Sequence, residues 1–333
     1  MGRERGRHTT ERAATRSVMQ SSPGFPPRLG APYFSPSPPD CVHPSILPLR
    51  AGLALLRVGQ SGLPGRAGAA LSRAASLRLQ RAERPAEAAI DALRTRLRQS
   101  ADTVEVVDYG AGTRGDKPPV RKVADIYRRA ATGAAWGRFL FGLARELRPA
   151  RVLELGTNLG VGAAHLAAAL ALNEADGGPE TRLVTLEGAP ALAALAAGHL
   201  ARLGHGVSDD PECRVRVVVG PFAETLPGVA EAEGPFDLVF VDGHHEAGAA
   251  LRYLNVLRPH LADGALIVLD DVEPGRPVRE AFEQLRAEAP SAYAGKYGLL
   301  VHTAAPGPDS RREGAPAPAA RESVPPPTSA GDA

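Results

Sequence analysis

The stretch RVLELGTNLGVGAAHLAAAL, residues 151–170, decides the expected fold because it has the order of a strand, a glycine turn and a helix. Its first five residues are a strand-like, mostly apolar run, residues 156–162 supply the turn, and residues 163–172 are strong helix formers. In α/β proteins this order points the amino end of a helix at a ligand. We therefore predict a cofactor loop here.

A second glycine-rich stretch, VEVVDYGAGTRGDKPP at residues 104–119, does not meet the same requirements. Pro118 and Pro119 follow its glycines and prevent a helix from starting directly after them. We interpret this stretch as a loop that packs near the site.

Four further apolar runs follow the cofactor loop, at residues 182–187, 215–220, 236–243 and 264–271. Their hydrophobicity is continuous rather than alternating, which is typical of strands covered on both faces. The expected fold class is therefore α/β, with a doubly wound, mostly parallel, Rossmann-like sheet. Ligands bind such sheets at the carboxyl ends of the strands. Five acidic residues sit at the carboxyl ends of the predicted strands: Glu154, Glu187, Asp242, Asp270 and Asp271.

The composition of the chain limits the classes of binding partner that we expect. With 39 basic and 37 acidic residues the formal net charge is +2, which argues against a general nucleic-acid partner. Two cysteines cannot form a disulfide framework, and no apolar run approaches the length of a membrane span. We expect a cytoplasmic protein with a small-molecule partner, no nucleic acid and no membrane.

The ends of the chain differ from its middle. Residues 1–85 are expected to form a disordered or weakly helical extension, although an arginine-rich, acid-poor start is also typical of an organellar transit peptide. Residues 86–303 are expected to form the folded domain. Residues 304–333 are rich in proline and alanine and are expected to be a disordered tail.

The glycine spacing bears on the cofactor. Gly156, Gly160 and Gly162 read G-x-x-x-G-x-G, whereas a dinucleotide fingerprint reads G-x-G-x-x-G. The spacing therefore disfavours an NAD-linked oxidoreductase. Glu187 suits the two hydroxyls of a ribose, a feature that both kinds of cofactor share.

Several motifs together resemble the class I S-adenosylmethionine-dependent methyltransferases, in particular bacterial small-molecule O-methyltransferases of the catechol type. They are VLELGTNLGVGAAHLA, TLEG, GPFAETLP, FDLVFVDGHH, GALIVLDDV and, upstream, VEVVDYGAGTRG. The resemblance covers roughly residues 86–302 and implies the methyltransferase fold, S-adenosylmethionine as cofactor and O-methylation of a small molecule. Similar enzymes are commonly homodimers. A pocket lined by acids suits a cationic cofactor without phosphates.

The resemblance also implies roles for individual residues. It assigns cofactor binding to Glu154, Gly156, Thr157, Gly160, Glu187, Ala223, Glu224 and Asp242. In catechol-type enzymes the acids after the fourth and fifth strands bind a divalent metal, which implies a Mg²⁺ site at Asp242, Asp270 and Asp271. The alternative is that Asp270 and Asp271 cap the turn into a helix that begins at Pro277.

Candidate catalytic residues are Asp242, near the sulfonium, and His245, whose imidazole can accept a hydroxyl proton near neutral pH. Glu273 and Pro274 depart from the related group, where an aromatic pair is usual. Few residues remain for the last hairpin of the sheet, so an edge strand is expected to be trimmed or missing. Together with the altered pair, this leaves open the alternative that the protein binds the cofactor without catalysing a reaction.

The segment GAAWGRFLFGLAREL before the first strand is apolar, with Trp136, Phe139, Phe141 and Leu143. We expect it to be a helix that covers the sheet. The alternative is a lid over the methyl acceptor, for which Tyr109, Arg114 and Tyr127 are candidate contacts.

Overall fold

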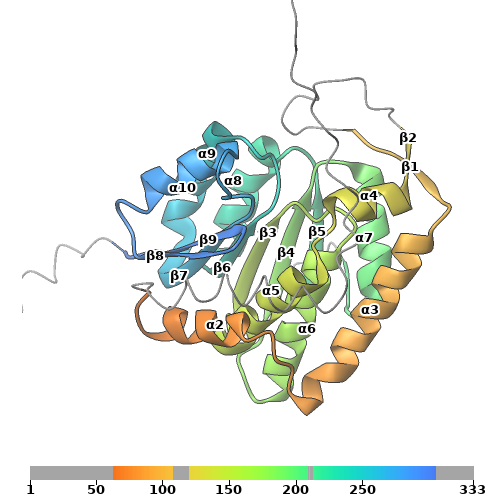
Figure 1. The fold of residues 1–333 in the computed structure, drawn as a ribbon, viewed down its shortest axis with the longest axis horizontal. Coiled ribbons are helices and arrows are strands. Elements are labelled where there is room, and N and C mark those ends of the chain that lie inside the picture. The colour runs from red at the N-terminus through yellow and green to blue at the C-terminus, as the bar shows by residue number, and fades with distance from the viewer. Residues whose placement is uncertain (1–62, 108–119, 209, 211–212, 305–333) are drawn as a thin grey trace, which may run out of the picture. The chain divides into compact units, whose positions relative to one another are not determined.

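The structure is a computed structural model that describes residues 63–107, 120–208, 210 and 213–304. Its centre is a seven-stranded sheet with the order β5-β4-β3-β6-β7-β9-β8 (Figure 1). The strands are β3 (Arg151–Leu155), β4 (Arg182–Glu187), β5 (Val215–Val219), β6 (Phe236–Val241), β7 (Leu261–Leu269), β8 (Ser291–Ala294) and β9 (Tyr297–Val301). β9 pairs antiparallel with β7 and β8, and the other pairs are parallel. The predicted fold class is confirmed.

Helices cover both faces of this sheet (Figure 1). Apolar residues of α2 (Gly65–Ala75), α5 (Ala134–Leu147) and α6 (Val161–Ala175) form one core with one face of the strands. Those of α8 (Phe222–Glu233), α9 (Ala247–Leu257) and α10 (Pro277–Leu285) form a second core on the other face. Residues alternate between the two cores along a strand, as Val152 and Leu153 do in β3. This two-sided burial explains why the strand sequences are continuously apolar.

The remaining helices and strands contribute little to these two cores. Helices α3 (Arg84–Gln99), α4 (Val123–Ala130) and α7 (Pro190–Arg202) share a third, smaller core. Strands β1 (Thr103–Glu105) and β2 (Val120–Lys122) form an antiparallel pair, and η1 (Arg81–Glu83) and η2 (Arg258–His260) are single 3₁₀ turns. The β1–β2 pair brackets the stretch that we interpreted as a loop near the site.

The folded part begins earlier than the predicted residue 86. Helix α2 packs against α5, and its Leu71 is 1% exposed. A Cβ on Gly142 of α5 would lie 2.7 Å from the Cα of Ala74, so small residues bring the two helix backbones close together. The predicted tail after residue 304, and residues 1–62, lie outside the described residues.

We expect Leu71→Ala to lower the free energy of unfolding by about 2–5 kcal/mol, because it removes a fully buried side chain and leaves a cavity between α2 and α5. Urea unfolding of the full chain measures this. Arg81→Ala, at an exposed position, is the control and is expected to change stability by less than about 0.5 kcal/mol. Equal stability of Leu71→Ala and the wild type would mean that α2 contributes nothing to the core.

The last hairpin is complete, contrary to the expectation of a missing edge strand. β8 and β9 are joined by only two residues, Gly295 and Lys296, and Gly295 has a φ of 65°. Glycine adopts this left-handed conformation at little cost, which permits so short a turn. In the described part of the chain, no helix is long and apolar enough to cross a membrane.

Candidate functional site

A pocket of about 430 Å³ lies at the carboxyl ends of β3, β4, β5 and β6. This is the edge at which doubly wound sheets bind ligands. The pocket is lined by Val106, Val107, Arg121, Ile126, Ala130, Gly156, Asn158, Glu187, Gly188, Leu192, Pro221, Phe222, Ala223, Asp242, Gly243, His244, His245 and Tyr253. Val106, Val107 and Arg121 come from the β1–β2 pair and the residue pair that follows β1.

The glycine turn after β3 forms one wall of the pocket. The amides of Gly156 and Thr157 donate to the carbonyl of Leu186 at 2.9 and 3.1 Å, which fixes the turn to β4. Gly156 has a φ of 106°, and a Cβ on it would lie 2.2 Å from the carbonyl oxygen of Asp242. Only glycine permits this close approach of the two loops.

Glu187 stands at the end of β4 with both carboxylate oxygens oriented. One oxygen accepts from the amide of Asn158 at 2.7 Å and the other from the amide of Ala189 at 2.9 Å. A carboxylate oxygen can accept more than one hydrogen bond, so a carboxylate held in this way can also accept from the hydroxyls of a ligand. The side chain is partly buried and lines the pocket.

Glu154 and Thr157 lie beneath the pocket rather than on its wall. Glu154 is 1% exposed and accepts from the Thr185 hydroxyl at 2.6 Å, and the Thr185 and Thr157 hydroxyls are 2.5 Å apart. Burial raises the pKa of Glu154 to about 8; the negative charge of Glu187 adds to this, and the hydrogen bond from Thr185 opposes it. The carboxyl group is therefore neutral at pH 7 in the ligand-free protein.

The raised pKa of Glu154 predicts a pH dependence of stability. Between about pH 4.5 and 8 the folded state holds a proton that the unfolded state releases, so the free energy of unfolding falls as the pH rises, by about 1.4 kcal/mol per pH unit for this group. We expect Glu154→Gln to remove this contribution, so that its stability exceeds the wild-type value at pH 8 and approaches it near pH 5. Chemical unfolding at both pH values measures this. Glu180→Gln, at an exposed position, is the control, and an equal pH slope in Glu154→Gln and wild type would contradict the assignment.

A second group of acids lies at the ends of β6 and β7. Asp242 lines the pocket, and burial, the charge of Asp270 and a hydrogen bond with Asp270 raise its pKa well above the usual value. Asp270 is 4% exposed and accepts from the Lys296 ammonium at 2.5 Å and from the amide of Asp271 at 2.7 Å. Burial opposes the charge of Lys296, but the carboxylates of Asp270 and Asp242 outweigh it and raise the lysine pKa.

The donor set of this group does not fit the predicted magnesium site. Three aspartates match the chemistry of Mg²⁺, but one oxygen of Asp270 already binds the Lys296 ammonium and the other accepts from a backbone amide, so a cation is already present at this carboxylate. Asp271 instead faces His245, with its carboxylate 3.4 Å from the imidazole Nδ1. Among residues 63–107, 120–208, 210 and 213–304, no group of three or more His, Cys, Asp or Glu side chains has the arrangement of a metal site.

The alternative is that Asp270 and Asp271 cap the turn into the helix from Pro277. Arg276 is the N-cap of α10, and no side chain there accepts from the helix amides.

Aromatic and imidazole side chains form another part of the pocket wall. His244 Nδ1 lies 2.8 Å from the Tyr253 hydroxyl, and the rings of Tyr253 and Phe222 meet edge to face at 5.7 Å. His245 has a side chain that is 45% exposed. An exposed imidazole beside a carboxylate can accept a proton from a bound hydroxyl.

The structure brings together part of the predicted set. Gly156, Glu187, Ala223, Asp242 and His245 line one pocket. The other predicted residues lie outside its lining: Glu154 and Thr157 beneath it, Gly160 as the N-cap of α6, exposed Glu224 on α8, Asp270 beside Asp242, and Asp271 beside His245.

The segment with Trp136 is helix α5, and it covers the sheet. Phe139, Phe141 and Leu143 are buried in the core that α5 shares with α2 and α6. Tyr127 is 8% exposed and packs beside Arg94 and Arg98. Tyr109 and Arg114 lie outside the described residues.

Sequence reasoning missed several residues of the site. Asn158, Phe222 and Tyr253 line the pocket, and Lys296 meets Asp270 from the last hairpin. Asn158 could have been predicted from the sequence motif, since it lies in the same glycine turn. Lys296 had only a compositional signal, because the chain has three lysines and this one stands alone in an apolar hairpin.

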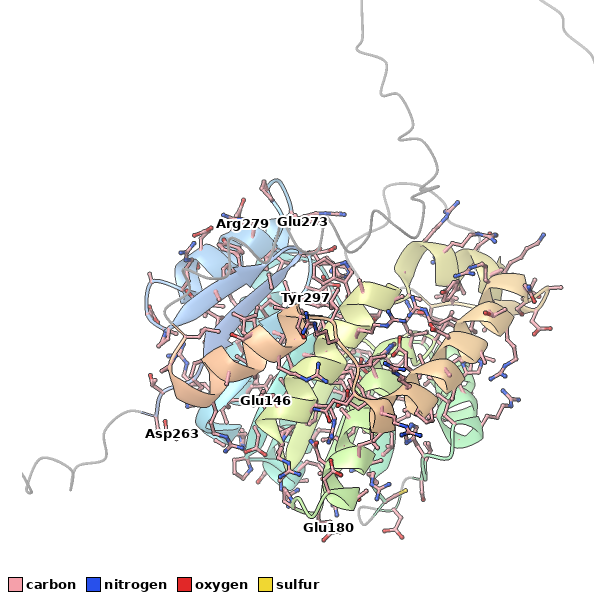
Figure 2. All side chains as sticks on the ribbon, turned by 60° about the horizontal axis from the view of Figure 1, so that its bottom comes forward. Glu146, Glu180, Asp263, Glu273, Arg279 and Tyr297 are labelled. Carbon is pink, nitrogen blue, oxygen red and sulfur yellow. The ribbon has the colours of Figure 1, made fainter. Side chains whose placement is uncertain are left out.

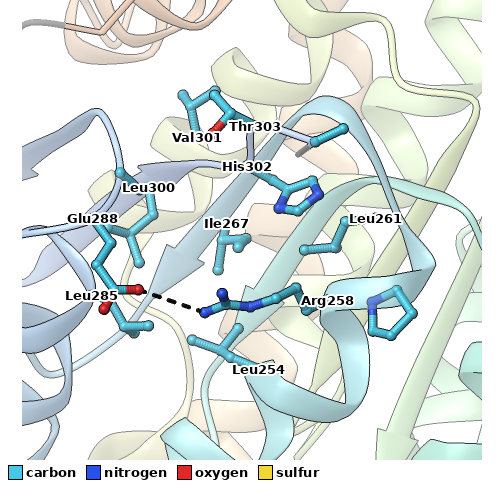
Figure 3. Close-up of a pocket in the computed structure, with 13 residues that line it drawn as sticks. Leu254, Arg258, Leu261, Ile267, Leu285, Glu288, Leu300, Val301, His302 and Thr303 are labelled. Carbon is cyan, nitrogen blue, oxygen red and sulfur yellow. Dashed lines mark ion pairs between the residues drawn. The ribbon is translucent and has the colours of Figure 1, made fainter. Parts of the chain in front are cut away.

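A second cavity, of about 500 Å³, lies at the opposite edge of the sheet, near the start of β7 and the end of β9 (Figure 3). Its walls are mainly apolar, with Leu254, Ile267 and Leu300 among them, and Arg258 and Glu288 form a 4.0 Å ion pair across it. None of the acidic residues at the described strand ends is among its lining residues.

The chain is similar in sequence to known methyltransferases. A family profile described as a methyltransferase domain matches residues 153–272. The catechol O-methyltransferase of Mycobacterium tuberculosis is 42% identical over 147 residues, which are 44% of this chain and 59% of that protein. A probable O-methyltransferase of the same organism is 36% identical over 153 residues, 44% of this chain and 60% of that protein.

Among solved structures, the O-methyltransferase TomG from Streptomyces achromogenes, in complex with S-adenosylmethionine, is 25% identical, with coverage of 68% of this chain and 92% of that one and a TM-score of 0.43. The chain spans about three fifths of the length of the two curated relatives. The family and sequence matches confirm the resemblance that the motifs indicated.

Proposed function

We propose that this chain, whose residues 153–272 carry a class I methyltransferase domain, transfers a methyl group from S-adenosylmethionine to an oxygen of a small molecule. The observation that carries the proposal is the pocket itself. It places an oriented carboxylate, Glu187, and a glycine turn without room for a side chain, Gly156, at the carboxyl ends of β3 and β4.

The lining residues suggest how the cofactor is held. Glu187 would accept from the two ribose hydroxyls, and Phe222 and Ala223 would border the adenine. The methionine end would then reach Gly156 and Asp242, where acidic groups suit a sulfonium and an ammonium. The glycine spacing and the acidic lining do not favour an NAD-linked oxidoreductase.

Methyl transfer needs mainly contact and alignment. The acceptor oxygen attacks the methyl carbon, the carbon–sulfur bond breaks, and sulfur keeps the electron pair as the neutral thioether of S-adenosylhomocysteine. The hydroxyl proton goes to His245, which lies on the pocket wall and is oriented by Asp271. Because two relatives are catechol O-methyltransferases, we propose an aromatic hydroxyl as the acceptor, bounded by Phe222 and Tyr253.

His245→Ala is expected to lower kcat about tenfold, below the range typical of a buried base because water can replace a half-exposed imidazole. The rate of the variant should then rise with pH as the acceptor ionises by itself. Steady-state methyl transfer between pH 6 and about 9 measures this, as in general-base analysis. An unchanged pH profile in His245→Ala would contradict a role in proton transfer.

Calorimetric titration of the full chain with S-adenosylhomocysteine and with NAD⁺ tests the proposal. We expect binding of the first only, followed by methylation of catechol in the presence of S-adenosylmethionine. Binding of NAD⁺ alone would replace the proposal by the oxidoreductase alternative. Binding of S-adenosylhomocysteine without turnover of any aromatic hydroxyl would favour the non-catalytic protein.

A further inference from the structure

Lys296 reaches the acidic group from a distant part of the chain. It stands in the two-residue turn between β8 and β9, and β9 pairs with β7, so the turn lies beside the end of β7, where Asp270 follows. The backbone fixes it there, because the amide of Val272 donates to the carbonyl of Lys296 at 3.0 Å. The position of the lysine is thus set by strand pairing.

The surroundings hold the ammonium against Asp270. The ammonium lies 5.0 Å from the ring centre of Tyr297 and 6.0 Å from that of Trp136. Tyr297 lies inside the domain, whereas Glu180, Asp263 and Glu273 lie at its surface (Figure 2). The Lys296 side chain is 19% exposed and that of Asp270 4%, so the ion pair is largely shielded from water.

This ion pair occupies the place where catechol-type enzymes would need a divalent cation. A metal bound by Asp242 and Asp270 would have to displace the ammonium from the Asp270 oxygen 2.5 Å away or lie next to it. Two cations at such a distance in a partly dry site repel each other strongly. Lys296 already supplies the positive charge that the buried acids need.

We propose that the ammonium of Lys296 takes the place of the divalent cation at the Asp242 and Asp270 pair, so that this site excludes Mg²⁺ and Lys296 balances the charge of the acceptor oxygen. Only the second part of this inference, the role of Lys296 toward the acceptor oxygen, rests on the proposed function. Its first half concerns metal binding and stands independently of any reaction.

Binding of Mn²⁺, a probe for Mg²⁺ sites, tests the exclusion by electron paramagnetic resonance on the full chain. We expect the wild type to bind no Mn²⁺ with a Kd below about 1 mM. Lys296→Met should create a Mn²⁺ site at least about tenfold tighter. Lys296→Arg, which keeps the charge, should bind none, and Asp270→Asn added to Lys296→Met should remove the new site.

Lys122→Met is the matched control, since Lys122 is an exposed lysine. It should gain no Mn²⁺ site. Tight Mn²⁺ binding by the wild type overturns the proposal, as does a folded Lys296→Met variant without a gain. If Lys296→Met does not fold, Lys296→Gln replaces it, and the wild-type measurement decides on its own.

The same samples separate this inference from the proposed function. Titration with S-adenosylhomocysteine reports the cofactor site whatever the Mn²⁺ result. If the wild type binds neither S-adenosylhomocysteine nor Mn²⁺, the proposed metal exclusion is supported and the proposed methyltransferase function is refuted. Wild-type transfer at full rate in the presence of a chelator, with a loss in Lys296→Met that Lys296→Arg restores, is the expected activity result.

Discussion

Gly156→Ala is expected to reduce the affinity for S-adenosylhomocysteine at least about 1,000-fold, the largest effect of any single change at the site. The new Cβ would lie 2.2 Å from the carbonyl oxygen of Asp242, which is backbone and cannot turn aside. The loops after β3 and β6 must therefore separate, and the alanine is also strained at a φ of 106°. Calorimetric titration of the full chain measures the loss.

Gly177→Ala separates the effect of backbone strain from that of the clash. Gly177 also has a positive φ, of 73°, but a Cβ there would meet no atom within 4 Å. We expect this control to lose about 1 kcal/mol of stability and to bind S-adenosylhomocysteine as the wild type does. Equal binding by Gly156→Ala and wild type would show that the ligand does not need the close approach of the two loops.

Glu187→Ala is expected to weaken binding of S-adenosylhomocysteine about 100-fold, which is about 2.7 kcal/mol. Two hydrogen bonds from ribose hydroxyls to a carboxylate account for a loss of this size. The variant also leaves the amides of Asn158 and Ala189 without their acceptor, which loosens the turn that the ligand contacts.

Two further variants serve as comparisons for Glu187→Ala. Glu187→Gln keeps one acceptor oxygen and is expected to lose only about tenfold in affinity. Glu180→Ala, at an exposed position seven residues earlier in the chain, should bind as the wild type does. If Glu187→Ala and Glu180→Ala bind S-adenosylhomocysteine with similar affinities, the ribose does not bind at the end of β4.

Local patterns in the sequence were sufficient for much of the framework. The five apolar runs are strands β3 to β7, and residues 163–172 lie within α6, because two-sided burial demands continuous hydrophobicity and helix formers follow the turn. Gly156 and Glu187 were found for the same reason, since Gly156 directly follows β3 and Glu187 is the last residue of β4. Helix α2 was expected only as part of a disordered or weakly helical extension, because its glycines and a preceding proline weaken a helix in isolation, and the contact with α5 stabilises it.

What the sequence by itself determined is the α/β sheet, the glycine turn and the acids that end its strands, because these follow from residues adjacent in the chain. Tertiary structure decided which of those acids face the pocket and what each one meets. Asp270 meets Lys296, 26 residues later, because β9 returns antiparallel beside β7. Glu154 meets Thr185 because β3 and β4 pair in parallel register. Such partners depend on strand pairing across the sheet, a relation that spacing along the chain does not contain.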